Sequence, residues 1–163
     1  MSLECLRVGF GVDQHALVEG RALILGGVHI PFFKGLLGHS DGDVLVHAIM
    51  DALLSAAGLK DIGTLFPGSD PAYKNVKSLN LLSNVKDFLD KERVGIINID
   101  GSMLVQKPII CPFIDDMRSN IAAILDILPK NVIIKAKSPE GIGSMGRCEG
   151  IEAFAAVLTY FKQ

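Results

Sequence analysis

Residues 39–51 read His39-Ser40-Asp41-Gly42-Asp43-Val44-Leu45-Val46-His47-Ala48-Ile49-Met50-Asp51, and here the sequence changes from a sheet-like to a helical pattern. Ser40 is a good N-cap residue, and the acid Asp43 three positions later suits the positive end of a helix dipole. An apolar stripe at helical spacing follows, formed by Val46, Met50, Leu53 and Leu54. We therefore predict a helix from Ser40 to about Gly58.

Strand and hairpin signals precede this helix. Residues 6–10 read as a strand, and residues 22–25 and 28–31 flank Gly26-Gly27, a strong signal for a two-residue hairpin turn. The N-terminal part of the chain should therefore contain sheet and a small β-hairpin.

Three further helices are predicted beyond residue 58. Residues 77–90 carry an apolar face at helical spacing, and Pro112 opens a helix that Pro129 ends. Residues 152–161 read as a closing helix that is apolar on nearly all sides. Such a helix must be covered by other parts of the protein.

Two strands are predicted between these helices, at residues 96–106, interrupted near Gly101, and at residues 132–137. No repeat or linker divides the chain. Residues 1–163 should therefore form a single α/β domain, of α+β type, with helices on one face of a mixed sheet.

The composition narrows the classes of partner. The chain has 163 residues, 49% of them hydrophobic, and 17 glycines, and we expect the surplus apolar surface to be buried between subunits of a homo-oligomer. A net charge of −2 and the absence of tryptophan argue against a nucleic acid partner. No stretch approaches the roughly 20 apolar residues that cross a bilayer, so no membrane partner is expected.

The cysteines and the N-terminus indicate the compartment. Cys5, Cys111 and Cys148 form no C-x-x-C pair, so neither a disulfide framework nor a cysteine zinc site is predicted. The first ten residues lack the features of a signal peptide. We therefore expect a soluble, cytoplasmic protein, or one of a plastid-type organelle if a transit peptide has been removed.

Asp13 and His15 lie two residues apart, so in an extended segment their side chains project from the same face. In the predicted helix, Asp43, His47 and Asp51 form a polar seam at i, i+4 and i+8. His47 added to Asp13 and His15 would make an Asp/His/His set with a vacant fourth position, the arrangement of a catalytic zinc. The alternative is that Asp13 caps a turn and the histidines are ordinary polar neighbours.

A glycine-rich loop follows residue 137. Gly141, Gly143 and Gly146 would let backbone N–H groups approach phosphate oxygens, and Glu140 and Arg147 add one charge of each sign. The alternative is a plain surface loop. Residues 61–67 likewise have a plain structural alternative, a tight connection between two elements that Pro67 closes.

Together these pieces resemble the 2-C-methyl-D-erythritol 2,4-cyclodiphosphate synthase family of non-mevalonate isoprenoid biosynthesis. The matching segments are residues 7–15, residues 39–51, residues 61–67 and residues 140–147. The resemblance implies conversion of 4-diphosphocytidyl-2-C-methyl-D-erythritol 2-phosphate to 2-C-methyl-D-erythritol 2,4-cyclodiphosphate and CMP. It also implies a phosphorus–oxygen lyase, a four-stranded sheet backed by helices, and a homotrimer with active sites at subunit interfaces.

The resemblance assigns two metals. Asp13, His15 and His47 would bind a catalytic Zn²⁺, and Glu140 would bind Mg²⁺ or Mn²⁺ between the substrate phosphates. Asp51 would orient a zinc-binding histidine. In the implied reaction one anionic phosphate attacks another. Zinc with an open coordination position would polarise the β-phosphate and so reduce this repulsion.

The resemblance also carries over a substrate set. The catalytic residues would be His39, Asp51, Lys137, Ser138 and Glu140. The substrate-binding residues would be Asp13, His15, His39, Ser40, Asp61, Ile62, Gly63, Phe66, Lys74, Val105, Ile109, Ile110, Cys111, Lys137, Ser138, Glu140 and Arg147. Among them, Asp61 and Gly63 would contact the methylerythritol hydroxyls, and the backbone around Val105 and residues 109–111 of a neighbouring subunit would hold cytosine.

The chain departs from the family's pattern in three places. Lys137 stands where the first of two threonines is usual, and we predict that it contacts the nucleotide phosphates. Gly68 replaces an acid, and Ser144-Met145 replaces Phe-Thr near the trimer axis. The rival functions are a zinc-dependent phosphohydrolase, in which the metal activates water, and a catalytically weak trimeric binding protein on the same fold.

Overall fold

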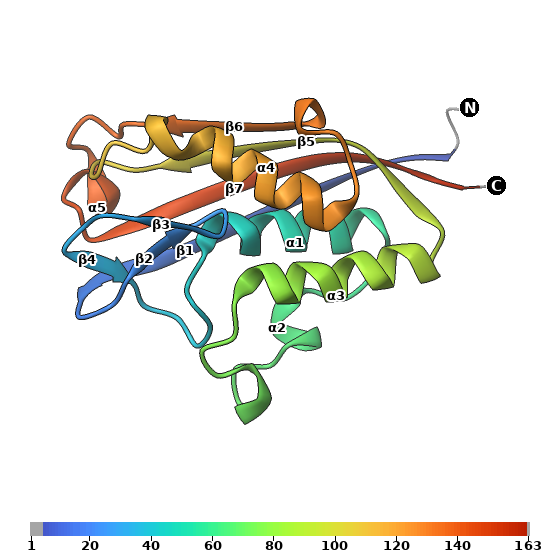
Figure 1. The fold of residues 1–163 in the computed structure, drawn as a ribbon, viewed down its shortest axis with the longest axis horizontal. Helices are drawn as coiled ribbons and strands as arrows, with labels where there is room; N and C mark the ends of the chain where they lie inside the picture. The colour runs from blue at the N-terminus through green and yellow to red at the C-terminus, as the bar shows by residue number, and fades with distance from the viewer. Residues whose placement is uncertain (1–4, 163) are drawn as a thin grey trace.

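The computed structural model describes residues 5–162 and contains a five-stranded mixed sheet backed by helices (Figure 1). The strand order is β4-β1-β7-β5-β6, and of these pairs β5–β6 alone is parallel among the described residues. The bounds are β1 Leu6–Glu19, β4 Lys34–Leu36, β5 Val94–Leu104, β6 Val132–Lys137 and β7 Gly150–Phe161. The predicted α+β class is confirmed, but the predicted four strands become five, because β4 pairs with the end of β1.

Helices α1, α3 and α4 and the hairpin lie close to their predicted positions, whereas the one-turn helices α2 and α5 lie in segments that were predicted as a tight connection and a loop. Their bounds are α1 Val44–Ala56, α2 Ile62–Leu65, α3 Ser78–Lys91, α4 Ile114–Leu125 and α5 Gly143–Gly146, with 3₁₀ turns η2 Pro71–Tyr73, η3 Cys111–Phe113 and η4 Pro129–Asn131. The hairpin consists of β2 Leu23–Leu25 and β3 Val28–Ile30. Gly26 and Gly27 both have positive φ, as the predicted tight turn requires.

The predicted C-terminal helix is wrong, because residues 150–161 form β7. This strand lies between β1 and β5, so its backbone hydrogen bonds are made to both neighbours. Alternate residues such as Ile151 and Val157 are buried, while Phe154 and Leu158 lie on the other face. Because both faces are apolar, the period-two signal of a strand is masked and the segment resembles a buried helix.

Two other strands differ from their predicted bounds. β1 continues from residue 10 to Glu19, and β5 runs through Gly101 without interruption. A Cβ built on Gly101 would lie 3.0 Å from Cδ1 of Leu45 in α1. The glycine therefore makes room for the helix and does not end the strand.

Close packing of α1 on β1 places the functional residues. A Cβ on Gly9 would lie 1.8 Å from the carbonyl oxygen of Ala52, and one on Gly11 would lie 2.1 Å from that of Ala48. Real Cβ atoms never approach backbone so closely, so the strand needs glycine where the helix crosses it. The same face of β1 continues into Asp13, which is thereby brought beside the N-terminal part of α1.

The opposite face of β1 carries an apolar strip that no other part of residues 5–162 buries. Val8, Phe10 and Val12 are all exposed, and Phe10 keeps 60% of its surface accessible. These exposed side chains differ from those on the other face of the sheet, which are buried in the core beneath α1. Within residues 5–162, no helix has the length and apolarity needed to traverse a bilayer.

Candidate functional site

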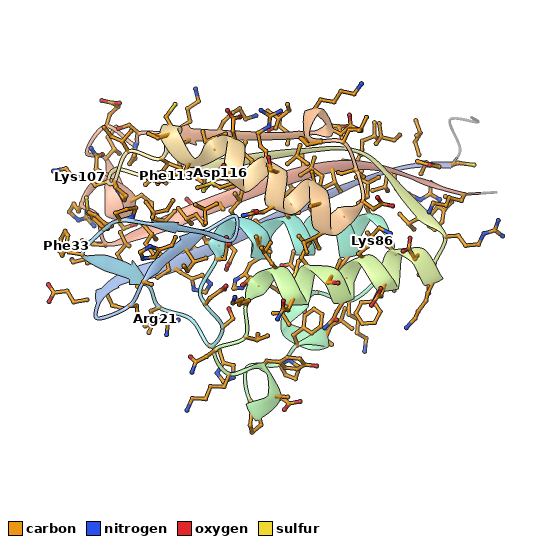
Figure 2. The ribbon with its side chains drawn as sticks, viewed as in Figure 1. Arg21, Phe33, Lys86, Lys107, Phe113 and Asp116 are labelled. Atoms are coloured by element: carbon orange, nitrogen blue, oxygen red, sulfur yellow. The ribbon has the colours of Figure 1, made fainter. Side chains whose placement is uncertain are left out.

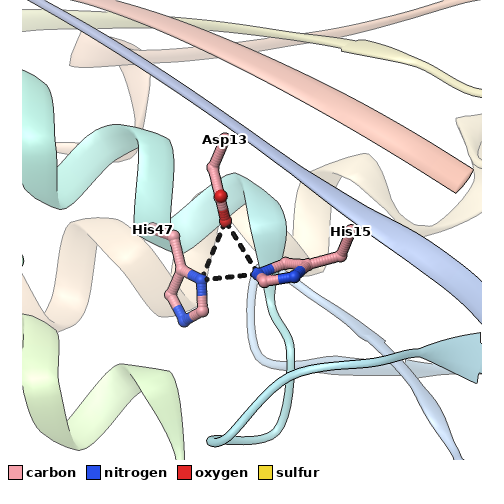
Figure 3. Close-up of side chains that lie close together, drawn as sticks. All are labelled: Asp13, His15 and His47. Atoms are coloured by element: carbon pink, nitrogen blue, oxygen red, sulfur yellow. Dashed lines mark hydrogen bonds and ion pairs between the residues drawn. The ribbon is translucent and has the colours of Figure 1, made fainter. Parts of the chain in front are cut away.

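Asp13 and His15 of β1 and His47 of α1 converge on one point (Figure 3). Oδ2 of Asp13 lies 2.9 Å from Nε2 of His15 and 2.9 Å from Nδ1 of His47. The two histidine nitrogens are 3.2 Å apart. The structure therefore brings together the three side chains that the sequence analysis proposed as metal ligands.

These three atoms fit a shared metal ion. Tetrahedral zinc with bonds of about 2.0–2.1 Å places its ligand atoms about 3.3 Å apart, a few tenths of an ångström more than the separations found here. One carboxylate and two imidazoles are also the donor set of a catalytic site, which leaves a fourth position for substrate. The geometry thus matches a metal-binding triad.

The charges within the triad depend on one another. Burial raises the pKa of Asp13, but its hydrogen bonds with His15 and His47 outweigh burial and hold it well below its usual range. Burial lowers the pKa of His47, but its bond with Asp13 and the negative charges of Asp13, Asp43 and Asp41 raise it above the usual value. The raised pKa means that a proton on His47 competes with an incoming metal ion up to a higher pH than it would on a free imidazole.

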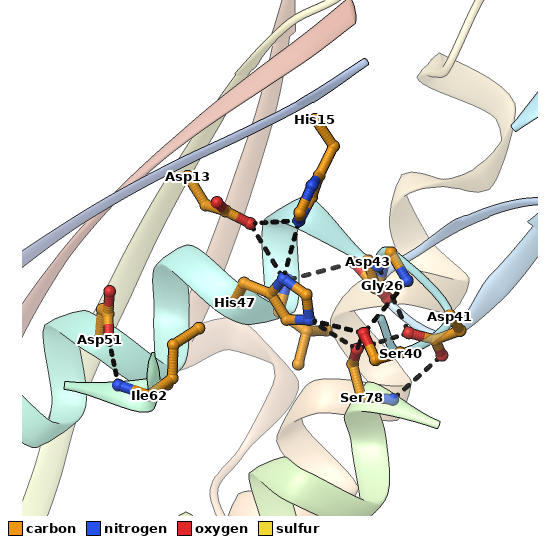
Figure 4. Close-up of polar contacts among 12 residues, drawn as sticks. Asp13, His15, Gly26, Ser40, Asp41, Asp43, His47, Asp51, Ile62 and Ser78 are labelled. Carbon is orange, nitrogen blue, oxygen red and sulfur yellow. Dashed lines mark hydrogen bonds and ion pairs between the residues drawn. The ribbon is translucent and has the colours of Figure 1, made fainter. Parts of the chain in front are cut away.

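The far side of the His47 ring faces two buried hydroxyls (Figure 4). Nε2 of His47 lies 3.0 Å from Oγ of Ser78 and 3.1 Å from Oγ of Ser40. Ser78 in turn donates its hydroxyl proton to Oδ1 of Asp41. No role was predicted for Ser78, because this first residue of α3 belongs to no motif that indicates one.

Asp43 has a structural role and does not belong to the predicted polar seam. It is itself the N-cap of α1, in place of the predicted Ser40, and its Oδ1 accepts hydrogen bonds from the backbone N–H groups of Val46 and Gly26. Oδ2 accepts from Gly27. Burial raises the pKa of Asp43 to about 6, and these three bonds oppose that rise. Asp43 therefore joins the hairpin to the start of α1.

Asp51 also has a different partner from the one predicted. Its carboxylate accepts a hydrogen bond of 2.8 Å from the backbone N–H of Ile62, at the start of α2. Burial raises the pKa of Asp51. Asp51 thus anchors the turn that carries Ile62 and Gly63, and its hydrogen bond goes to that turn and not to a histidine.

A cavity of about 210 Å³ opens beside the triad. Its lining includes five more residues of the predicted substrate set, His39, Ser40, Ile62, Gly63 and Phe66. The structure adds Gly68, Tyr73 and Leu81, of which Tyr73 packs edge-on against Phe66 with ring centroids 5.5 Å apart. The cavity is therefore lined by the triad on one side and by apolar side chains, among them Phe66 and Tyr73, on the other.

Asp61 and Lys74 do not line this cavity. Asp61 is the exposed N-cap of α2, where it accepts a hydrogen bond from the N–H of Thr64 and lines a separate hollow with Asp51. Lys74 is exposed at the end of η2. Their predicted contacts with substrate stay predictions.

The remaining predicted residues form a second group in the segments that follow β5 and β6, at the end of the sheet where Figure 2 labels Lys107. The N–H of Val105 donates to the carbonyl of Lys137, and the N–H of Gly141 donates to Oε1 of Gln106. Members of this group that are exposed are Ile109, Cys111, Lys137, Ser138, Glu140 and Arg147, while Val105 and Ile110 are buried. None of them lines the cavity beside the triad.

Comparison with known proteins gives one consistent family. The sequence model described as the YgbB family matches residues 6–160. The 2-C-methyl-D-erythritol 2,4-cyclodiphosphate synthase of Pelotomaculum thermopropionicum is 52% identical over 155 residues, which cover 95% of this chain and 96% of the relative.

Two solved structures extend the likeness to the fold. The bifunctional IspDF from Campylobacter jejuni is 40% identical with a TM-score of 0.93; the match covers 97% of this chain, which spans only 43% of the length of that protein. The CDP complex of IspF from Plasmodium falciparum is 34% identical with a TM-score of 0.85, and the match covers 99% of this chain and 100% of that one.

Proposed function

The chain belongs to the YgbB family, and on that premise we propose that it converts 4-diphosphocytidyl-2-C-methyl-D-erythritol 2-phosphate to 2-C-methyl-D-erythritol 2,4-cyclodiphosphate and CMP. The observation that carries the proposal is the triangle of Asp13, His15 and His47 at the mouth of a cavity. Seven of the seventeen substrate-binding residues expected from the family resemblance line that cavity. The activity would make the protein a phosphorus–oxygen lyase of the non-mevalonate pathway.

The reaction is an internal phosphoryl transfer. An oxygen of the 2-phosphate attacks the β-phosphorus, the bond from that phosphorus to the bridging oxygen breaks, and CMP leaves with the electron pair. No water is consumed. Since the substrate's own ends must meet in line, the protein contributes mainly by positioning and by neutralising charge.

The cavity residues divide this work. Phe66 and Tyr73 provide an apolar wall against the carbon chain, and the Ile62–Gly63 turn, held by Asp51, offers backbone groups to the hydroxyls. His39 and Ser40 lie on the phosphate side. Arg21 fixes this loop by donating from Nη2 to the carbonyl of Ser40 over 2.7 Å.

Two metal sites belong to the proposal. Asp13, His15 and His47 would hold Zn²⁺, and Glu140 would be the protein ligand of Mg²⁺ or Mn²⁺, which takes its other ligands from phosphates and water. When bound, these ions supply Lewis-acid polarisation of the β-phosphate and neutralise the charge of the departing nucleotide. A chain of net charge −2 needs such local cations to hold a polyanionic substrate.

We infer a homotrimer in which the second group of residues serves the triad of a neighbour. Two observations support this: the exposed apolar strip of Val8, Phe10 and Val12, and the position of Lys137 and Glu140 outside the chain's own cavity. Backbone groups around Val105 and residues 109–111 would hold the cytosine of the neighbour's substrate. The CDP complex of the Plasmodium falciparum relative is in keeping with a cytidine nucleotide as part of the ligand.

The test is turnover of the substrate in ¹⁸O-labelled water with analysis of both products. The proposal requires cyclic diphosphate and CMP in equal amounts without solvent oxygen. A linear product carrying ¹⁸O would support a phosphohydrolase, and binding without turnover would support an inactive binding protein. His47→Ala is the negative control, and Ser119→Ala, on the exposed side of α4, is a matched surface variant that should keep full activity.

A further inference from the structure

We propose that Ser78 is the positioning residue of His47 and that Asp41 sets the direction in which Ser78 acts. The inference rests on the proposed metal site, whose ligand His47 must present Nδ1 with a free electron pair. Ser78 and Asp41 thus join the residues that the metal site requires, and together they orient the His47 ring.

The number of protons on each group fixes the direction of these hydrogen bonds. A serine hydroxyl has one proton, and an ionised carboxylate only accepts hydrogen bonds. Because Ser78 donates to Oδ1 of Asp41, its oxygen can face Nε2 of His47 only as an acceptor. Nε2 must then carry a proton of its own, and Nδ1, which points at Asp13 and His15, is the atom that binds a metal ion once the proton it shares with Asp13 is displaced.

Ser40 does not impose the same direction. Its oxygen lies 3.1 Å from Nε2 and accepts a hydrogen bond from the N–H of Gly42. Its own proton reaches no carboxylate among the described residues, the nearest hydroxyl partner being Ser78 at 3.5 Å. Ser40 can therefore donate or accept, whereas the proton of Ser78 is already committed.

Hydrogen bonds to the backbone fix Asp41 in the position from which it accepts the Ser78 proton. Its Oδ2 accepts from the N–H of Ser78 over 3.0 Å, which caps α3 in place of Lys77, whose side chain makes no cap bond. The backbone N–H of Asp41 donates to Val76, and that of Asn75 donates to His39. Both carboxylate oxygens thus meet Ser78 in a fixed geometry.

The hydrogen bond between Ser78 and His47 is buried, so water cannot replace it. Ser78 is fully buried and the side chain of His47 is only 10% exposed. If the oxygen of Ser78 were removed, solvent could not replace it, and Nε2 would depend on the unoriented hydroxyl of Ser40. Outer partners of metal-binding histidines are commonly worth about 10- to 100-fold in metal affinity, and that range is expected here.

The experiment measures zinc affinity of metal-free protein by competition with a chromophoric chelator. Ser78→Ala should bind zinc about 10- to 100-fold more weakly than wild type, while Ser119→Ala should match wild type. Asp41→Asn should also weaken binding, because its amide can donate to Ser78 and release the serine proton toward Nε2. In the Ser78→Ala background, Asp41→Asn should weaken zinc binding much less than it does in the wild-type background, because only the loss of the Asp41 charge near His47 remains.

The double-mutant cycle separates this role from mere support of the fold. Any weakening of the α3 cap by Asp41→Asn should change the melting temperature in EDTA equally in both backgrounds, whereas most of its effect on zinc affinity should disappear in the Ser78→Ala background. Visible absorption of the Co²⁺-loaded protein gives an independent signature, since a misplaced imidazole changes the ligand field. Zinc affinity of Ser78→Ala within about threefold of wild type, or additive effects, would overturn the inference. Wild-type protein that bound no zinc would contradict the proposed function itself.

Discussion

The two groups of predicted metal ligands differ in how far a single chain prepares them. The Asp13–His15–His47 triad lies between a strand and a helix, with ligand atoms no more than 3.2 Å apart and a buried network behind it. Glu140 stands on an exposed turn with φ of 53°, where its N–H bonds the hydroxyl of Ser138. Regular elements can preorganise a site, whereas a loop ligand needs substrate or a neighbouring subunit to complete its surroundings.

The largest expected effect comes from separating α1 from β1. Gly11→Ala would place a methyl carbon 2.1 Å from the carbonyl oxygen of Ala48, so the helix must move and His47 with it. We expect the free energy of unfolding to fall by about 3 kcal/mol or more, measured by urea denaturation. Gly68→Ala is the control, because its Cβ meets nothing closer than 3.8 Å. Equal stability of the two variants would contradict this account of the packing.

Next in size is the contrast between His47→Ala and Glu140→Gln. Loss of His47 should abolish stoichiometric zinc binding together with turnover. Glu140→Gln should leave zinc affinity unchanged, because it lies outside the triad, while kcat/KM falls by about 100-fold or more. Calorimetric zinc titration and a CMP-release assay measure the two quantities. Zinc binding that fell equally in both variants would mean that the groups are not independent.

The stabilisation conferred by zinc should grow with pH. The raised pKa of His47 means that its proton, shared with Asp13, stabilises the metal-free protein fully below about pH 6.5 and that this stability is lost as pH rises through the raised value. The depressed pKa of Asp13 acts in another window, since its contribution is present above about pH 4 and is lost below it.

Zinc competes with the His47 proton, so its affinity should rise by up to about tenfold per pH unit below that pKa. The shift of melting temperature on adding zinc should accordingly be larger at pH 8.5 than at pH 6. A zinc shift that did not change, or that shrank, over this range would contradict the assignment of a proton to His47.

A charge on the uncovered face should separate assembly from zinc binding. Phe10→Asp should dissociate the proposed trimer and reduce turnover, while each monomer keeps its triad and its zinc. Light scattering with size-exclusion chromatography measures the mass. Phe33→Asp is a matched control, because Phe33 is also exposed, at 68%, but lies beside the edge strand β4 and away from the strip. Equal masses for both variants would refute the proposed interface.

The smallest expected effect is that of Lys137→Thr. If Lys137 contacts nucleotide phosphates, this substitution should raise KM by about tenfold, the order expected for one charge-assisted hydrogen bond. Lys130→Thr, on the exposed η4 turn, should leave KM unchanged. Unchanged affinity and turnover in Lys137→Thr would show that this departure from the family's pattern has no role in binding.

Features with a local cause could be predicted from the sequence. The Gly26-Gly27 hairpin, α3 and β6 follow from turn chemistry and from periods that the backbone imposes, and the structure confirms them. The pairing of Asp13 with His15 is of the same kind, because neighbours at i and i+2 share a strand face. Bringing His47 to that pair rested on the family's combined motifs, and the structure confirms the convergence.

Features that depend on contact between distant segments were decided only by tertiary structure. Residues 150–161 are a strand because β1 and β5 offer edges on both sides, a fact that an apolar run cannot encode locally. Asp51 accepts a hydrogen bond from Ile62. Ser78 lies against the ring of His47 although the two are 31 residues apart in the sequence. Backbone geometry sets a segment's local periodicity, but the partner of a side chain depends on how the whole chain packs.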